Sequence, residues 1–236
     1  MTARDNYKQE VLDFKYKNKF LYKDLYKNSC NEIAINIIES WPIWPSDNRI
    51  TCIYGPPGSG KTHIANIWRE KVDAIVYEGI NSLTLDYIYS IKQPLIFENL
   101  NNNLNWPEEL LFEFLNEIKS SNNYLLITCN ENPLKFGWKL KDLISRISSF
   151  TNIEIKLPDD ELIKKILVKQ FSDRQLSIDK QYIEYISLRI ERSYLAINNV
   201  VKIIDKLTLK YKKSVNYNLI KEALSYLTKI TNKSSL

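Results

Sequence analysis

The sequence has few of the residues that catalytic triads, zinc sites and disulfide scaffolds require. It contains one histidine, His63, and three cysteines among 236 residues. A single histidine argues against histidine-based triads and zinc hydrolases, which use several such side chains. Cys30, Cys52 and Cys129 are odd in number and lack C-x-x-C spacing. We therefore expect reduced cytosolic thiols rather than disulfides or zinc ligands.

Long apolar runs and a strong charge excess are also missing. No apolar run approaches the length of about 18 residues that a membrane span needs, and residues 1–19 are polar without the apolar core of a signal peptide. We expect a cytoplasmic protein without a membrane partner. The net charge of +5 comes from 33 basic and 28 acidic residues. This balance permits a basic face for DNA but does not require one.

Glycine is scarce as well, yet three of the five glycines fall within residues 55–62. This stretch reads Gly-Pro-Pro-Gly-Ser-Gly-Lys-Thr, which is the G-x-x-x-x-G-K-T pattern of a phosphate-binding loop. A β-branched apolar run at 49–54 precedes it, and a segment with helical spacing at 63–69 follows it. Strand, glycine loop and helix is the order that this pattern needs, so the sequence predicts nucleotide binding.

The physical basis of this prediction is the backbone of the loop. Small residues let successive N–H groups turn inward around an anion, and the helix N-terminus adds the positive end of its dipole. We expect Lys61 to contact the β- and γ-phosphates of ADP or ATP, and the Thr62 hydroxyl to hold Mg²⁺. The candidate nucleotide-binding residues of the loop are Gly55, Pro57, Gly58, Ser59, Gly60, Lys61, Thr62 and His63.

Strand-like and helix-like segments alternate up to Pro158, and only helix-like segments follow it. The expected strands are 49–54, 74–77, 94–99, 124–130 and 153–157, and the expected helices between them are 83–91, 107–118 and 140–147. Helices are then expected to begin near residues 160, 179, 193 and 216. Alternation predicts an α/β fold with a parallel P-loop sheet, followed by a small all-helical lid domain. The predicted domains are a flexible arm (1–20), the nucleotide-binding domain (21–157) and the lid (158–236).

The segment before the first strand contains two further signals. Ser29-Cys30-Asn31-Glu32 has the pattern of a capping box, and Ile33, Ile37 and Ile38 would form the apolar face of the helix that follows. Trp41-Pro42-Ile43-Trp44-Pro45 then indicates a packed, rigid loop. A contribution of this loop to an adenine pocket is the alternative.

A parallel α/β core followed by a helical lid resembles the arrangement of AAA+ ATPases, and the remaining motifs fit this resemblance. Glu98 ends a strand where such proteins have the Walker B acid that holds Mg²⁺, and Asn99 stands where a catalytic Glu polarises water. Asn130 ends the next strand at the sensor 1 position. Arg146, at the end of Asp142-Leu143-Ile144-Ser145-Arg146, stands where an arginine finger acts on a neighbouring subunit's nucleotide.

The chain is most similar to the DnaA branch of AAA+ proteins, and within it to the alphaproteobacterial form of the Hda family. This resemblance rests on residues 41–45, 55–62, 142–146, 171–176 and 189–193 and covers nearly the whole chain. It implies a sliding-clamp-binding peptide in the arm, for which Gln9, Leu12 and Phe14 have the required spacing, although Glu10 departs from the usual Leu. It implies two partners, the DNA polymerase sliding clamp and DnaA. We expect neither a DNA-binding domain after the lid nor a long helicase-recruiting N-terminal domain, and DNA contact only indirectly or weakly.

Some residues depart from the AAA+ pattern. Glu98 replaces the usual Asp, which Mg²⁺ tolerates imperfectly because it demands octahedral geometry. Asn99 cannot act as a base. The sensor 2 position is open between Arg192 and Leu195. We therefore expect weak or absent intrinsic ATPase activity.

Three functions remain at this point. The first is a nucleotide-bound, clamp-tethered regulator that presents Arg146 to DnaA–ATP, promotes hydrolysis there and so negatively regulates initiation of DNA replication. The second is an AAA+ ATPase acting on DNA, such as a helicase loader of the DnaC type. The third is an interaction module stabilised by its nucleotide. The sequence leaves open whether ADP or ATP is bound and whether the protein forms homo-oligomers.

Overall fold

The computed structural model describes residues 25–44, 49–78, 92–100 and 107–233. The arm with Gln9, Leu12 and Phe14 lies outside the described residues, as does the helix predicted at 83–91.

The described strands form one parallel sheet in the order β2-β3-β4-β1-β5. They are β1 (Ile50–Tyr54), β2 (Ile75–Glu78), β3 (Leu95–Leu100), β4 (Leu125–Cys129) and β5 (Thr151–Glu154). Every neighbouring pair is parallel, which confirms the predicted α/β class. β5 begins two residues earlier than the expected strand 153–157, and Ile155 extends its pairing by donating its N–H to the carbonyl of Tyr54 at 2.7 Å.

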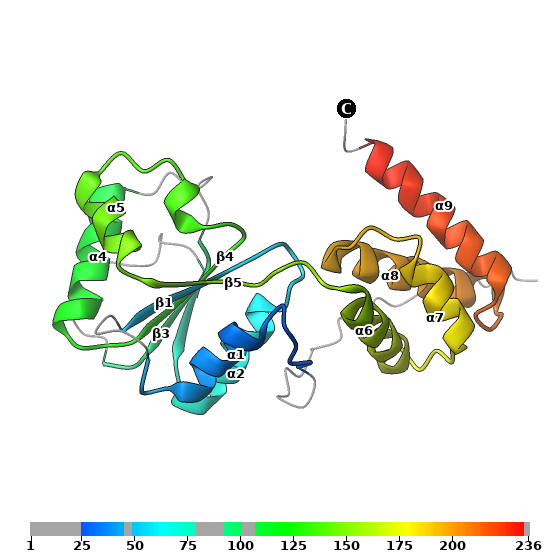
Figure 1. Cartoon of the computed structure of the whole chain (residues 1–236), viewed down its shortest axis with the longest axis horizontal. Coiled ribbons are helices and arrows are strands. Elements are labelled where there is room, and N and C mark those ends of the chain that lie inside the picture. The colour runs from blue at the N-terminus through cyan, green and yellow to red at the C-terminus, as the bar shows by residue number, and fades with distance from the viewer. Residues whose placement is uncertain (1–24, 45–48, 79–91, 101–106, 234–236) are drawn as a thin grey trace, which may run out of the picture.

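Side chains alternate between the two faces along each strand, and apolar side chains point to both. Helices therefore cover both faces of the sheet. One face packs against α1 (Glu32–Ser40) and α2 (Lys61–Val72), and the other packs against α4 (Glu108–Ser120) and α5 (Lys141–Ser148) (Figure 1). A short 3-10 turn (Pro133–Lys135) connects β4 to α5. Cys52 and Ile127 face the α4–α5 side, whereas Ile53 and Leu126 face the α1–α2 side.

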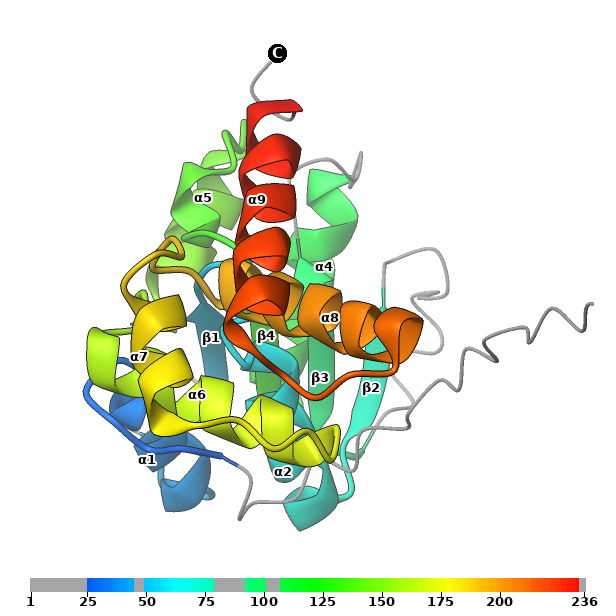
Figure 2. The same ribbon diagram turned by 90° about the vertical axis from the view of Figure 1, so that its right-hand side faces the viewer.

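The second half of the molecule is a helical lid with its own core. It consists of α6 (Asp160–Asp173), α7 (Lys180–Ser187), α8 (Tyr194–Tyr211) and α9 (Tyr217–Lys233), with α9 crossing over α8 in Figure 2. The side chains of Asp159 and Ser193 cap α6 and α8 by accepting the N–H groups of Leu162 at 2.7 Å and Ala196 at 3.1 Å. These caps explain why the sequence located the helix starts well.

The predicted capping box before α1 is wrong. Asn31, not Ser29, is the N-cap, and no side chain caps the helix there. Asn31 Oδ1 instead accepts the N–H of Asn28 at 3.0 Å, and its Nδ2 donates to the carbonyl of Tyr26 at 2.8 Å. These local side-chain bonds build a turn that competes with the box. Ile33 is also 61% exposed, so the buried face consists of Ala34, Ile35, Ile37 and Ile38.

The Trp-Pro loop is part of the core. Trp44 stacks on Trp68 of α2 at 5.2 Å between ring centroids and meets the edge of Tyr124 at 5.5 Å. Its indole N–H donates to the carbonyl of Ile37 at 3.0 Å. Tyr124 immediately precedes β4, so this cluster lies at the amino ends of the strands. The phosphate loop follows the carboxyl end of β1. Trp44 is packed as the rigid-loop interpretation expects, and a contribution of this loop to an adenine pocket stays a prediction.

Candidate nucleotide-binding site

The loop between β1 and α2 has the backbone geometry that the phosphate-loop pattern predicts. Gly58 and Gly60 have φ angles of 78° and 92°, in the left-handed region that favours glycine. Gly55 is required for a different reason, because a Cβ there would lie 2.6 Å from the carbonyl oxygen of Ile155. Each glycine of the motif thus has a structural cause.

Lys61 opens α2 and is only 6% exposed. Its Nζ donates to the carbonyl of Gly55 at 2.7 Å and to that of Pro56 at 3.0 Å. Burial lowers the pKa of this ammonium, while the neighbouring Cys129 and Glu98 act in the opposite direction. The loop therefore fixes a buried cation beside inward-turned backbone, which fits the phosphates of a nucleotide.

The other loop residues flank this cation. Ser59 is buried and its Oγ lies 3.5 Å from Lys61 Nζ. Pro57 and Thr62 are exposed, and His63 is half-buried. The carbonyl of Thr62 accepts the side-chain amide N–H of Asn66 at 2.8 Å.

Glu98 provides the strongest sign of a metal or metal-bound water at the site. This carboxylate on β3 is 7% exposed, and its Oε1 has no hydrogen-bond partner within the described structure. An unpartnered buried carboxylate oxygen is costly unless a cation or water satisfies it. The chemistry of Glu98 is compatible with Mg²⁺, and a shared site with Thr62 stays a prediction. No group of three or more acidic, histidine or cysteine side chains elsewhere in the described ranges could hold a metal.

Asn99 sits in a bulge that follows this carboxylate. The β3–β4 register shifts between Phe97 and Leu100, and Asn99 has a φ of 59°. Its backbone N–H donates to Thr128 Oγ1 at 3.1 Å. Asparagine tolerates this left-handed conformation better than most residues. The bulge presents an amide, not a carboxylate, at the strand end.

Asn130 lies at the same edge of the sheet. It is exposed and directly follows β4, whose last carbonyl, that of Cys129, accepts the N–H of Gly55 at 3.2 Å. Beneath this junction the thiols of Cys52 and Cys129 lie 3.2 Å apart. All three cysteines are buried, and burial raises the pKa of Cys52.

The start of α8 in the lid lies against the phosphate loop at Gly58. A Cβ added to Gly58 would lie 3.1 Å from Tyr194 Cβ and 3.2 Å from Asn198 Nδ2. Tyr194 is 6% exposed, and burial raises the pKa of its phenol. Asn198 accepts a hydrogen bond from the Gln170 amide of α6. Sequence analysis missed this pair, although the i, i+4 spacing after the Ser193 cap was a usable signal.

The two candidates for the sensor 2 position, Arg192 and Leu195, are both exposed. Arg192 pairs with Asp160 at 2.7 Å, with side chains 66% and 57% exposed. Leu195 is 53% exposed. The residues of α8 that meet the loop are Tyr194 and Asn198, and a role of Arg192 in nucleotide binding stays a prediction.

Arg146 lies in the last turn of α5, on the sheet face opposite α2. The buried Leu143 and Ile147 anchor this helix. The Arg146 guanidinium is half-buried and donates to Asn116 Oδ1 of α4, while its Nε is buried without a partner in the described structure. Arg146 is thus held against α4 rather than projecting freely.

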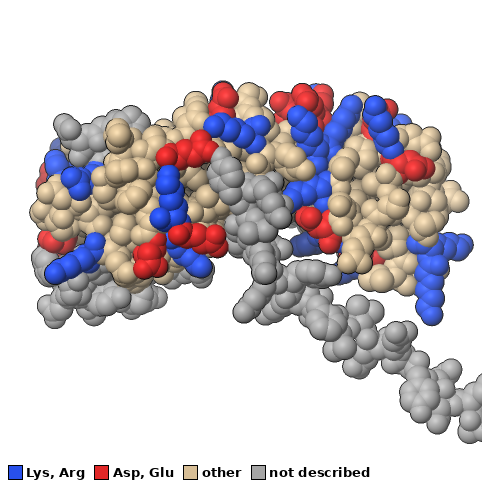
Figure 3. All heavy atoms as spheres, turned by 90° about the horizontal axis from the view of Figure 1, so that it is seen from below, with Lys and Arg blue, Asp and Glu red and all other residues tan. Residues whose placement is uncertain are grey.

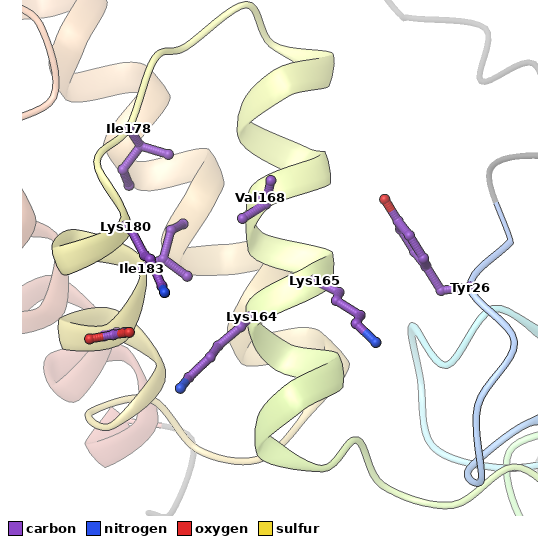
Figure 4. Close-up of a pocket in the computed structure, with 8 residues that line it drawn as sticks. Tyr26, Lys164, Lys165, Val168, Ile178, Lys180 and Ile183 are labelled. Atoms are coloured by element: carbon purple, nitrogen blue, oxygen red, sulfur yellow. The ribbon is translucent and has the colours of Figure 1, made fainter.

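A separate cavity of about 410 Å³ lies between α6, α7 and Tyr26 (Figure 4). Its lining includes Lys164 and Lys165 on α6 and Lys180 on α7, and no phosphate-loop residue lines it. This cavity is therefore not part of the nucleotide site. Among the helices that the structure describes, none is both long and apolar enough to cross a bilayer.

Comparisons with known proteins agree with this geometry. No protein-family model matches the chain. The chromosomal replication initiator protein DnaA of Borrelia garinii subsp. bavariensis is 22% identical over 257 residues, covering 96% of this chain and 53% of that protein. The chain therefore spans about half the length of the curated relatives it matches.

Two solved structures show the same fold. Domain III of Thermotoga maritima DnaA has a TM-score of 0.72 at 15% identity and covers 90% of this chain and 97% of that chain. AMPPCP-bound DnaA from Aquifex aeolicus has a TM-score of 0.65 at 19% identity, with coverages of 81% and 66%.

The strand order, the phosphate loop and the covering helices give this chain a P-loop α/β fold with a helical lid. The fold is that of domain III of DnaA, and the sequence is similar to DnaA at low identity over almost the whole chain.

Proposed function

We propose that this protein is a nucleotide-bound regulator, tethered to the sliding clamp, that promotes hydrolysis of ATP on DnaA and so negatively regulates initiation of DNA replication. One observation carries the proposal: a complete phosphate loop lies at the same sheet edge as a strand end that bears Asn99 instead of a catalytic carboxylate. A protein with this combination binds nucleotide well and hydrolyses it poorly. Its working partner then supplies the ATP that is hydrolysed.

The binding half of the proposal uses the loop and the lid. The backbone N–H groups of residues 58–62 would surround the phosphates of ADP or ATP, and Lys61 would neutralise them. Thr62 and Glu98 would hold Mg²⁺, which would neutralise phosphate charge. Asn130 would contact the terminal phosphate, and Tyr194 and Asn198 would close the loop from above.

The catalytic half uses Arg146. Asn116 holds one side of its guanidinium, and its buried Nε lacks a partner within the described residues. A phosphate of DnaA–ATP would replace Asn116 and satisfy the planar fork of donors. Such an arginine supplied in trans contributes about 10³–10⁵ in hydrolysis rate.

The tether is the arm at residues 1–20. Leu12 and Phe14 would enter an apolar pocket of the clamp, with the Gln9 amide at its rim. Residues 21–157 and 158–236 would act as the nucleotide-binding and lid domains, in the cytoplasm where DnaA works.

The decisive experiment measures DnaA–ATP hydrolysis on clamp-loaded DNA with the full chain and with Arg146→Ala. We expect Arg146→Ala to fold, bind ADP and bind the clamp, but to lose nearly all stimulation. Arg146→Lys should be almost as poor because an ammonium lacks the guanidinium fork. Asn116→Ala is the matched control, since it removes the partner of Arg146 and should keep stimulation. Stimulation that survives in Arg146→Ala would leave only an interaction module stabilised by its nucleotide.

The tether has its own test. Changing Gln9, Leu12 and Phe14 to Ala should abolish clamp binding, measured by surface plasmon resonance, without lowering ADP affinity. Undiminished clamp binding by this triple variant would refute the arm as the contact.

The buried carboxylate of Glu98 favours a second candidate, an AAA+ ATPase acting on DNA such as a helicase loader. This candidate predicts DNA-stimulated turnover faster than about one per second, in the range of working enzymes. The regulator predicts turnover far below that rate with or without DNA.

A further inference from the structure

The positive charge of the chain is concentrated in its last two helices. Residues 194–236 contain eight Lys or Arg and two Asp or Glu, whereas residues 1–193 contain 25 basic and 26 acidic side chains. The entire net charge of +5 therefore comes from the segment that forms α8 and α9. Figure 3 shows basic side chains projecting from the outer edge of the lid half, on the right.

The basic residues of α8 form a regular row on its exposed side. Lys202, Lys206 and Lys210 are all exposed and follow one another at i, i+4 and i+8. A helix rises by about 1.5 Å per residue, so these side chains leave it about 6 Å apart along one face. The opposite face of α8 is buried in the lid core. The exposed Lys212 and Lys213 continue the row beyond the left-handed helix end at Lys212.

The two acidic residues of this segment do not neutralise the row. Asp205 lies 3.8 Å from the guanidinium of Arg174 on α6, and Glu222 accepts the Tyr211 hydroxyl at 3.1 Å. Within the described part of the chain, no ion pair engages Lys202, Lys206, Lys210, Lys212 or Lys213. The row thus presents uncompensated positive charge to solvent.

Three tyrosine rings of the lid contact cations. Lys210 Nζ lies 4.9 Å from the ring centroid of Tyr211, and Lys221 Nζ lies 4.8 Å from that of Tyr217. Tyr217 meets Tyr185 of α7 edge to face at 5.0 Å, and the guanidinium of Arg189 covers Tyr185 at 3.7 Å. A ring that already contacts a cation has less rotamer freedom in the unbound protein. Binding a partner then costs less side-chain entropy.

From this arrangement we propose that the α8 row, continued by Lys212 and Lys213, binds the phosphodiester backbone of DNA. Evenly spaced ammonium groups on one helix face fit a linear polyanion, and interleaved tyrosines are typical of nucleic-acid surfaces. No carboxylate or amide of the row is placed to read bases, so binding is independent of sequence. An acidic protein surface would satisfy the charges but would not need this regular spacing.

The test is fluorescence anisotropy of the full chain on a labelled duplex of random sequence and on its single strand, without clamp or DnaA. Each phosphate contact lowers the slope of log Kobs against log[salt] by about 0.9 for duplex DNA. Changing Lys202, Lys206 and Lys210 to Gln should therefore weaken binding at least about tenfold at about 50 mM salt and make the slope less negative by about 2–3. Glutamine keeps a high helix propensity, so α8 should remain folded.

The control removes the same charge elsewhere. Lys92, Lys119 and Lys135 are exposed on the α/β half, and their change to Gln should leave the salt slope within about 0.5 of the unmodified chain, because phosphate contacts set that slope. Equal losses in both triple variants would overturn the proposal in favour of net charge alone. Binding to anionic phospholipid vesicles or to the clamp, with none to DNA, would overturn it as well. Because the readout needs neither Arg146 nor the arm, its failure is distinct from failure of the regulator.

Discussion

The carboxyl ends of β1 and β3 flank β4 at one edge of the sheet, yet they carry opposite chemistry. After β1, three glycines and a buried ammonium are arranged for an anion. Near the end of β3, a bulge contains Asn99 in a left-handed conformation, and the Asn99 backbone N–H bonds to Thr128. In the proposed function, the first region supplies the phosphate-binding loop, and the second lacks the base that hydrolysis needs. Nucleotide affinity and hydrolysis rate should then respond to substitutions at different strand ends.

The largest expected effect comes from repairing the weaker region. Asn99→Glu supplies a carboxylate beside an intact phosphate loop. A general base typically contributes about 10²–10⁴-fold in rate, so ATP turnover should rise by up to about that factor. Asn99→Gln is the matched control because it has the same length and the same backbone strain without the charge. Single-turnover hydrolysis measures both variants. Equal rates in the two would mean that the bulge, not the missing carboxylate, limits hydrolysis.

Damaging the stronger region should give the next largest effect. Lys61→Ala removes the buried ammonium, and each hydrogen bond to a charged group contributes about 1.5–3 kcal/mol. If Lys61 makes two such bonds to the phosphates, their loss should lower the affinity for ADP by more than about 100-fold. Calorimetry can measure this change. Arg69→Ala removes an exposed charge from the far end of the same helix and should leave affinity unchanged. Retained affinity in Lys61→Ala would remove the loop from the proposal.

A smaller effect separates the backbone of the loop from its contact with the lid. Gly58→Ala places a Cβ 3.1 Å from Tyr194 in a left-handed backbone, whereas Gly137→Ala meets the same strain with nothing within 4 Å. The left-handed conformation costs about 1–2 kcal/mol in each variant. Urea unfolding should show a further loss of about 1 kcal/mol in Gly58→Ala alone, within the usual range of overpacking. Equal losses would indicate that α8 yields freely at the loop.

Arg192→Ala should have the smallest effect. Arg192 and Asp160 form an ion pair with both side chains more than half exposed, so the pair contributes less than about 1 kcal/mol to stability. Thermal unfolding with and without ADP tests this together with the sensor 2 assignment. An unchanged melting temperature of the free protein combined with a lost ADP-induced increase would identify Arg192 as a nucleotide contact after all.

The fold followed from the sequence because its signals were local. Alternation of β-branched runs and helical spacing predicted the described strands and helices, and Asp159 and Ser193 marked two helix starts with side chains that do form caps. The capping box at Ser29 failed because Asn28 and Asn31 bond to each other instead. Ser29 and Ser193 both precede a helix-like segment in the sequence, but only Ser193 caps a helix. The hydrogen bonds of the turn before α1 made the difference.

The candidate site was predictable only in part. The loop motif is contiguous, so Lys61 and its glycines could be named from the sequence. The Asn99 bulge depends on the register of two strands and on Thr128, 29 residues away in the chain. The contact of Tyr194 and Asn198 with Gly58 depends on how the lid meets the α/β half. Such long-range geometry leaves no mark in any single stretch of sequence.

The stacking of Trp44 on Trp68 has a practical consequence for measuring this molecule. All five tryptophans precede residue 139, and the lid contains tyrosines but no tryptophan. Two indoles 5.2 Å apart and 29° from parallel are close enough for their electronic transitions to interact. Indole emission thus monitors the α/β half alone, whereas the helical far-ultraviolet signal includes the lid and its separate core. If helical signal falls on heating while indole emission stays constant, the lid melts as an independent unit.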